Sequence, residues 1–245
     1  MNIRPFPIAA LLATAIGLTT QTGVAATLYA NDFDGNFALD AGVFLNAATN
    51  GAFETAKPGF GNWSGNYFVN RRTGNPADPT TLTFTNLAPH STISIAFLLG
   101  FLESWDSRDS GTTFGPDNLD LSIDGVRVIS MTANNALGTI EDYAGGTELF
   151  DDVQLNDNMY FADALVDMST APLLTFAHSS TTLVVEVRAS GDGWQGGGDE
   201  AWGLDDVTIT YDGSRVTPVP APSALGLLVA AIGLGVSARR LRKTS

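Results

Sequence analysis

Acidic side chains gather near both ends of the central part of the chain. The segment NDFDG contains Asp32 and Asp34, and the segment GGDEAWGLDDVTITYDG contains Asp205 just before a predicted strand. The first and last strands of a two-sheet β-sandwich commonly pair, so these carboxylates are expected to meet. Carboxylate oxygens brought together from distant positions suit Ca²⁺, which accepts about six to eight oxygen ligands in flexible geometry. The pattern predicts a structural calcium site that joins the two ends of the domain.

A second acidic cluster lies in ESWDSRDSGTTFGPDNLDL, where Asp106 and Asp120 are further candidates for calcium. The spacing does not match an EF-hand loop, which requires a Gly at its sixth position and a Glu at its twelfth. A solvated loop in which Asp residues form turns is the alternative.

Aromatic side chains outside the alternating segments are candidates for sugar binding, because their apolar faces stack on pyranose rings. Trp63, Tyr67 and Trp194 lie in segments rich in Gly, Ser or Asp, and Trp194 in SGDGWQGGGD is the best candidate for an exposed platform. Trp202, just before the last predicted strand, is expected to pack in the core.

Signals for catalysis are weak. Glycosidases need two carboxylates at a set separation, and Glu103, Glu186 or Glu200 could supply them, but with 26 acidic residues some pair always fits. The sequence has no Cys and no G-x-S-x-G motif. His90 and His178 are expected to make hydrogen bonds that stabilise turns, because zinc needs more nitrogen or sulfur ligands than the chain offers. We predict a protein that is not an enzyme; the alternative is a secreted glycan hydrolase.

The elements that must position these residues are short strands. Period-two alternation bounded by turn residues recurs along the chain, and Asp124-Gly125 is a two-residue hairpin signal. The segment 141–168 is polar and poorly periodic, so we interpret it as a surface excursion with a short helix or strand near residues 160–166. The pattern predicts an all-β, antiparallel two-sheet jelly-roll sandwich over residues 27–215. Its alternating segments are TLTFTNL, STISIAFLLGFL, NLDLSIDGVRVISM, TTLVVEVRAS and DVTITY.

The charge of this body is strongly negative. All 26 acidic residues lie between Asp32 and Asp212, against seven basic residues in the same body, which gives a net charge of −19. Nucleic-acid binding is excluded as a function class, because phosphates must be neutralised by Lys and Arg. Metal cations or neutral partners are favoured.

Both ends of the chain are typical of export. Arg4, the apolar run IAALLATAIGL and the small residues Val24-Ala25-Ala26 predict a signal peptide over residues 1–26. Residues 216–245 contain a Pro-rich stretch, a short apolar run and a basic end, which predict a transmembrane sorting helix with its basic end in the cytoplasm.

The tail resembles those of the PEP-CTERM proteins of Gram-negative bacteria, through Pro220, Ala221 and Pro222, the apolar helix, and a basic end with Arg239 and Arg240. Ala221 stands where that family usually has Glu. The resemblance implies an exosortase-like processing protease as a partner, a transient inner-membrane intermediate, and delivery to the cell surface or extracellular matrix.

The body resembles the jelly-roll, lectin-like ectodomains found on many exosortase-sorted proteins. NDFDG, LAPHSTISIAFLL, LESWDS, PDNLDLSIDG, FAHSSTTLVVEV and DEAWGLDDVTI occur in that order. The resemblance implies a sandwich like a carbohydrate-binding module, with structural Ca²⁺ and extracellular polysaccharide as its partner.

Overall fold

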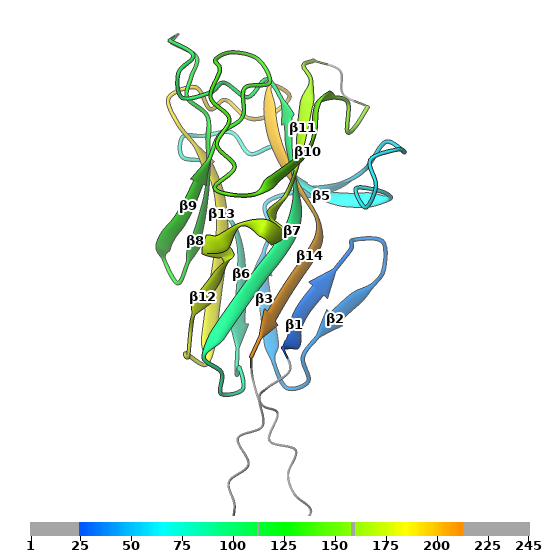
Figure 1. Cartoon of the computed structure of the whole chain (residues 1–245), viewed down its shortest axis with the longest axis vertical. Coiled ribbons are helices and arrows are strands. Elements are labelled where there is room, and N and C mark those ends of the chain that lie inside the picture. Colours follow the sequence, from blue (N-terminus) through cyan, green and yellow to red (C-terminus); the bar gives the residue numbers. More distant parts are fainter. Residues whose placement is uncertain (1–24, 112, 158–159, 213–245) are drawn as a thin grey trace, which may run out of the picture.

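The computed structural model describes residues 25–111, 113–157 and 160–212 as two antiparallel sheets packed face to face (Figure 1). The all-β, two-sheet prediction is confirmed. The expected signal helix and sorting helix lie outside the described residues. Within the described part of the chain, no helix is long and apolar enough to cross a membrane.

The larger sheet has nine strands, with β14 and β7 at its centre. Along β14, strand β7 pairs on one side, while β1 and β5 pair with different halves of the other side. Two 3₁₀ turns, η1 (Met168–Thr170) and η2 (Pro172–Leu174), precede β12. The nine strands are β1 (Ala26–Asn31), β2 (Phe37–Leu39), β4 (Ala52–Thr55), β5 (Asn66–Asn70), β7 (Thr92–Glu103), β10 (Thr147–Val153), β11 (Asp163–Asp167), β12 (Thr175–Ala177) and β14 (Glu200–Tyr211).

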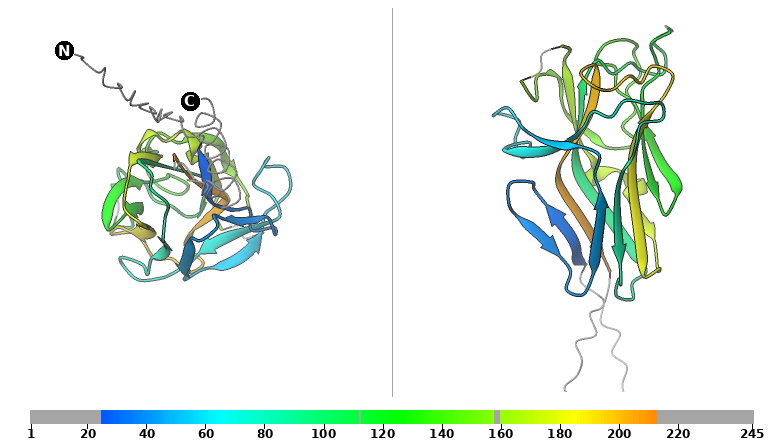
Figure 2. Two further views of the ribbon diagram at one scale, coloured as in Figure 1. Left: turned by 90° about the horizontal axis from the view of Figure 1, so that it is seen from below. Right: turned by 180° about the vertical axis from the view of Figure 1, so that it is seen from behind.

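The smaller sheet has five strands in the order β3-β6-β13-β8-β9 and lies across the core from the larger one (Figure 2). Strands β8 and β9 form the predicted hairpin, with positive φ angles of 50° at Asp124 and 79° at Gly125 that suit a two-residue turn. The five strands are β3 (Phe44–Ala48), β6 (Thr80–Thr85), β8 (Asn118–Ile123), β9 (Val126–Met131) and β13 (Thr182–Ser190).

The main core lies between the sheets, where the apolar sides of the alternating strands meet. Leu183, Val185 and Val187 of β13 face Ile93 and Ile95 of β7 across this core. Burial of each such side chain contributes roughly 1.5–3 kcal/mol. The alternation therefore fixes which face of each strand points inward.

A second, smaller core lies on the outer face of the larger sheet. Trp63, just before β5, and Tyr67, within β5, cover Leu98, Leu102 and Ala201 there. The approach is close because Gly100 and Gly203 lie opposite each other in the sheet. A Cβ atom at either glycine would lie about 3 Å from the Trp63 ring (2.9 and 3.0 Å).

The described domain begins and ends at the same pole of the sandwich. Ala26, at the start of β1, pairs with Tyr211, at the end of β14. The long connecting loops lie at the opposite pole (Figure 1).

Candidate functional site

The acidic residues of the first and last strands meet in one pocket. It has a volume of about 300 Å³ and is lined by Asp32, Asp34, Asn62, Ser64, Asp205 and Asp206. We call it the acidic pocket. It forms because β1 pairs with β14 up to Asn31 and Val207, which places the turn after β1 beside the irregular register of β14 at Asp205 and Asp206. The predicted meeting of these carboxylates is thus present in the structure.

Three of the four carboxylates in the acidic pocket accept hydrogen bonds from backbone N–H groups. Asp32 Oδ1 accepts from the backbone N–H groups of Asp34 at 3.0 Å and Asn36 at 2.9 Å. Asp34 Oδ1 accepts from the Asn66 backbone N–H at 2.7 Å, and Asp205 Oδ1 accepts from the Asp206 N–H at 2.8 Å. These bonds fix the oxygens in place.

The electrostatics of the pocket favour a proton or a cation. Burial, together with the charges of Asp206 and Asp34, raises the pKa of Asp205 to about 7. Burial and the charges of Asp32 and Asp34 also raise the pKa of Asp206. The pocket lining contains no Lys or Arg. Even so, no three Asp, Glu or His side chains within the described ranges are arranged closely enough to hold a metal ion as they stand.

Three members of this pocket were not predicted from the sequence, namely Asn62, Ser64 and Asp206. Strict alternation would direct adjacent Asp205 and Asp206 to opposite faces of β14. The register shift between Asp205 and Thr208, with a φ of 50° at Asp206, brings both to the same pocket. The adjacent Asp pair was the signal in the sequence.

Asp106 and Asp120 are not part of the acidic pocket. Asp106 is buried beside Asp117, whose carboxylate accepts a hydrogen bond of 2.7 Å from the Asp106 N–H. Asp120 lies on β8, where it pairs with Arg127 at 3.3 Å. The structure places Asp106 and Asp120 in different surroundings, and their expected role as calcium ligands stays a prediction.

The expectation of an exposed aromatic platform is wrong for all three candidates. Trp194 is only 4% exposed: its ring packs against Trp105 and its Nε1 donates to the Arg72 carbonyl at 3.1 Å. Trp63 and Tyr67 are fully buried in the second core. Gly- and Ser-rich surroundings suggested exposure, but here they allow the chain to wrap closely around large rings. Trp202 packs in the core as predicted.

A second, polar pocket lies near the loop pole. Its volume is about 550 Å³, and it is lined by Glu54, Thr55, Arg71, Asn156, Asp157, Gly197 and Gly198. We call it the polar pocket. The sequence analysis did not predict it, because Glu54 lies in a strand of mostly exposed residues and Arg71 in a loop.

A planar ion pair forms one wall of the polar pocket. Arg71 donates from Nε to Glu54 Oε1 at 2.9 Å and from Nη2 to Oε2 at 3.1 Å. The buried Tyr67 hydroxyl donates to the same Oε2 at 2.8 Å. Burial opposes ionisation of Glu54, but the Arg71 and Tyr67 hydrogen bonds outweigh it and hold the pKa of Glu54 below its ordinary value. These bonds hold the Arg71 and Glu54 side chains in a fixed orientation in the wall of the pocket.

The residues considered for hydrolysis do not form an accessible pair. Glu103 and Glu200 lie opposite each other on β7 and β14, but they are 0% and 1% exposed. Glu186 lies on the five-stranded sheet and pairs with Arg188 at 2.9 Å. His90 and His178 contact each other at 2.6 Å, and His178 also contacts Asp124 at 3.1 Å.

Comparison with known proteins gives weak matches only. No family model matches the chain, and no curated protein matches it. Among solved structures, the CBM22-1 xylan-binding domain of Paenibacillus barcinonensis Xyn10C is 10% identical with a TM-score of 0.34, covering 80% of this chain and 100% of that domain. The Clostridium thermocellum xylanase 10B CBM22-1–GH10 modules, complexed with xylohexaose, are 12% identical with a TM-score of 0.30, covering 80% of this chain and 30% of that one.

A virus protein matches to a similar degree. VP2 of the infectious bursal disease virus subviral particle is 15% identical with a TM-score of 0.27, covering 84% of this chain and 39% of that one. The TM-scores are too low, and the proteins too different from one another, for these likenesses to bear on function.

Proposed function

We propose that the protein is an exported, non-catalytic jelly-roll sandwich that binds extracellular polysaccharide in the polar pocket and is stabilised by Ca²⁺ in the acidic pocket. The proposal includes export by the signal peptide, an inner-membrane intermediate, and sorting to the cell surface or matrix by an exosortase-like protease acting at the tail. The observation that supports glycan binding best is the pre-formed Arg71–Glu54 wall of the polar pocket.

A neutral, hydroxyl-rich ligand fits this wall. A sugar hydroxyl both donates and accepts hydrogen bonds, and the wall offers Arg71 donors beside Glu54 acceptors in a rigid, bidentate frame. Because the frame is already ordered, less conformational entropy is lost on binding. Anionic polymers are disfavoured by the net charge of the body, whereas a neutral polysaccharide is not repelled.

The binding test compares two arginines. Titration of soluble extracellular polysaccharides and their oligosaccharides is expected to show binding that Arg71→Lys weakens at least tenfold, because Lys cannot make the bidentate contact. The control is Arg127→Lys, which alters an exposed pair on the other sheet. Equal binding by both variants would contradict this site. Release of new reducing ends would favour the hydrolase alternative instead.

Calcium binding is proposed because the acidic pocket crowds four carboxylates without a counter-charge among its lining residues. A divalent ion would offset their mutual repulsion, with small side-chain movements bringing the oxygens to its coordination distance. The ion would join the turn after β1 to β14 and so close the domain at its first and last strands.

Thermal melts test the calcium proposal. At free Ca²⁺ ten times the dissociation constant, binding adds about 1.4 kcal/mol to the free energy of unfolding, which raises the melting temperature by roughly 3–6 °C. Asp205→Ala should abolish the increase, whereas Asp157→Ala, whose side chain is 99% exposed in the polar pocket, should retain it. Identical melts in EDTA and millimolar Ca²⁺ would refute the proposal.

A further inference from the structure

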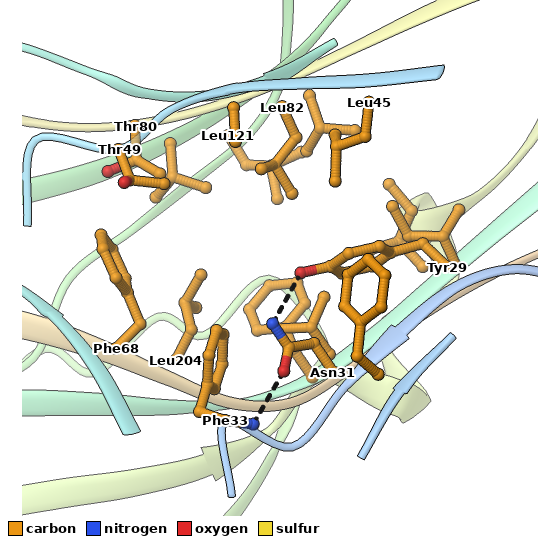
Figure 3. A pocket seen from close by; sticks show the side chains of 18 of the residues that line it. Tyr29, Asn31, Phe33, Leu45, Thr49, Phe68, Thr80, Leu82, Leu121 and Leu204 are labelled. Atoms are coloured by element: carbon orange, nitrogen blue, oxygen red, sulfur yellow. Dashed lines mark hydrogen bonds between the residues drawn. The ribbon is translucent and has the colours of Figure 1, made fainter. Parts of the chain in front are cut away.

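An apolar cavity lies between the two sheets, and neither proposed site uses it (Figure 3). Its volume is about 290 Å³. Phe97 and Leu204 of the larger sheet line one side, and Leu82, Leu121 and Val187 of the smaller sheet line the other. A sandwich core is normally packed with few voids larger than a water molecule, so an opening of this size is a departure that needs a reason.

The cavity opens along the edge of the sandwich where β2 and β3 lie. These strands end their respective sheets and are not hydrogen-bonded to each other, which leaves the space between the sheets uncovered there. Phe37 and Phe53 line the cavity and are 59% and 66% exposed. Ala47 of β3 also lines it and is exposed. Large apolar side chains gathered at an opening indicate a place where an apolar partner enters.

The Tyr29 hydroxyl projects into a space lined mainly by apolar side chains, with Asn31, Thr49 and Thr80 as the other polar residues. The Tyr29 hydroxyl accepts a hydrogen bond of 3.1 Å from Asn31 Nδ2, and Asn31 Oδ1 accepts from the Phe33 N–H at 2.9 Å (Figure 3). Burial raises the pKa of Tyr29, so the hydroxyl keeps its proton at neutral pH. A hydroxyl that accepts from Asn31 can still donate its own hydrogen to a ligand.

The size and lining of the cavity select the ligand class. An apolar cavity of about 150 Å³ stays dry and binds benzene, and ligand pockets begin at about 300 Å³. This cavity therefore suits more than a single ring but less than a large polycyclic molecule. Its lining offers no charged side chain, and a few polar groups, the Tyr29 hydroxyl and the side chains of Asn31, Thr49 and Thr80, interrupt the apolar surface.

We propose that this cavity binds the acyl chain of a medium-chain fatty acid, with the chain between the sheets and a carboxyl oxygen accepting a hydrogen bond from Tyr29. Phe37 and Phe53 flank the entrance and cover the part of the chain nearest to solvent. The cavity shares no lining residue with the polar pocket or the acidic pocket.

Calorimetric titration of purified, detergent-free protein with sodium dodecanoate below its micelle concentration tests the proposal. One molecule is expected to bind per chain. Val187→Phe fills the cavity from within and Ala47→Trp obstructs its entrance, and each should weaken binding at least tenfold. The matched control is Val126→Trp, an exposed position on the far edge strand β9, which should bind normally.

Two further comparisons test the Tyr29 hydrogen bond and the entrance separately. Tyr29→Phe should weaken dodecanoate binding about threefold to tenfold, the range for one hydrogen bond, and should leave toluene binding unchanged because toluene has no acceptor. If Val187→Phe fails to fold, Ala47→Trp still tests the entrance, because that residue is exposed. Binding that survives both obstructing variants, or that occurs only with micelles or phosphatidylcholine vesicles, would overturn the proposal.

Discussion

Strands β7 and β14 run side by side through the centre of the larger sheet, yet their two halves are buried in different ways. From Thr92 to Phe97, and from Leu204 to Tyr211, buried and partly exposed residues alternate. From Leu98 to Glu103, and from Glu200 to Gly203, every residue is buried. Near the chain ends only one face of these two strands is buried, and we call this the one-sided half. Near the loop pole both faces are buried, and we call this the two-sided half.

The second core explains the difference. The segment around Trp63 and Tyr67 covers the outer face of the sheet near the loop pole, so both faces of the strands are enclosed there. Buried carboxylates, including Asp117, Glu200 and Asp163, lie near the two-sided half, and the apolar cavity lies by the one-sided half. A continuous apolar run in an antiparallel strand can therefore indicate an added layer.

Removal of the Trp63 ring is expected to have the largest effect on the difference between the two halves. Trp63→Ala is expected to lower the free energy of unfolding by about 3–5 kcal/mol, because it deletes the largest buried side chain of the second core. Denaturant unfolding measures the loss. Phe44→Ala, at a position 68% exposed, serves as the control and should change stability by less than about 0.5 kcal/mol. Similar losses for both variants would mean that the outer layer adds little.

The buried carboxylates near the two-sided half are expected to make the stability of the protein depend on pH. Burial, with the nearby charges of Glu200 and Asp106, raises the pKa of Asp117 to about 8, and burial with Asp199 and Asp106 raises the pKa of Glu200 to about 7. The folded state therefore binds protons that the unfolded state has already lost above about pH 4. Stability should fall as the pH rises from 5 to 8.

Melting temperatures in EDTA between pH 5 and 8 check this expectation, with a fall of several degrees toward pH 8. Asp117→Asn should flatten the slope and raise the melting temperature at pH 8. The amide can keep the bond from the Asp106 N–H while removing the buried charge. Asp157→Asn is the exposed control. A melting temperature that rises with pH over this range would show that other groups dominate.

Substitution of a glycine beneath Trp63 is expected to have the smallest effect on stability. Gly203→Ala places a Cβ atom 3.0 Å from the Trp63 ring and 2.9 Å from the Tyr67 ring, so we expect a loss of about 1–3 kcal/mol from overpacking. Gly198→Ala is the matched control, because open space surrounds that position and its φ is not in the left-handed region. Thermal unfolding of the two variants should differ by several degrees. Equal stability of the two variants would show that the Trp63 and Tyr67 rings can move aside without a loss of stability.

The sequence predicted the one-sided parts of the fold well. Leu119, Leu121 and Ile123 alternate with polar residues, and the structure buries all three in β8. Among the strands that the sequence did not predict, β2, β3, β4 and β10 have mostly exposed residues, so hydrophobic alternation could not reveal them. Strand β5 was also missed, although four of its five residues are buried, because its buried residues are consecutive rather than alternating. The excursion at 141–168 contains β10 and β11, and the tertiary contacts of β11 with β7 stabilise a segment whose local pattern is weak.

Only some residues of the candidate sites could be predicted from the sequence. Asp32, Asp34 and Asp205 were found because pairing of the first and last strands is a rule of topology rather than of local sequence. The burial of Trp194 was missed because it depends on contact with Trp105, 89 positions away in the sequence. The Glu54–Arg71 wall was missed for a similar reason, since ten residues separate β4 from β5 and the sequence has no short two-residue turn that would indicate their pairing.

The pairing of Ala26 with Tyr211 has a mechanical consequence. An attachment at either end of the domain pulls on neighbouring strands at one pole, so force enters and leaves through β1 and β14 without crossing the loops. A molecule held by that pole on a surface would stand with the long connecting loops directed outward, toward whatever polymer surrounds it (Figure 1). Tension would load the hydrogen bonds between these two strands first.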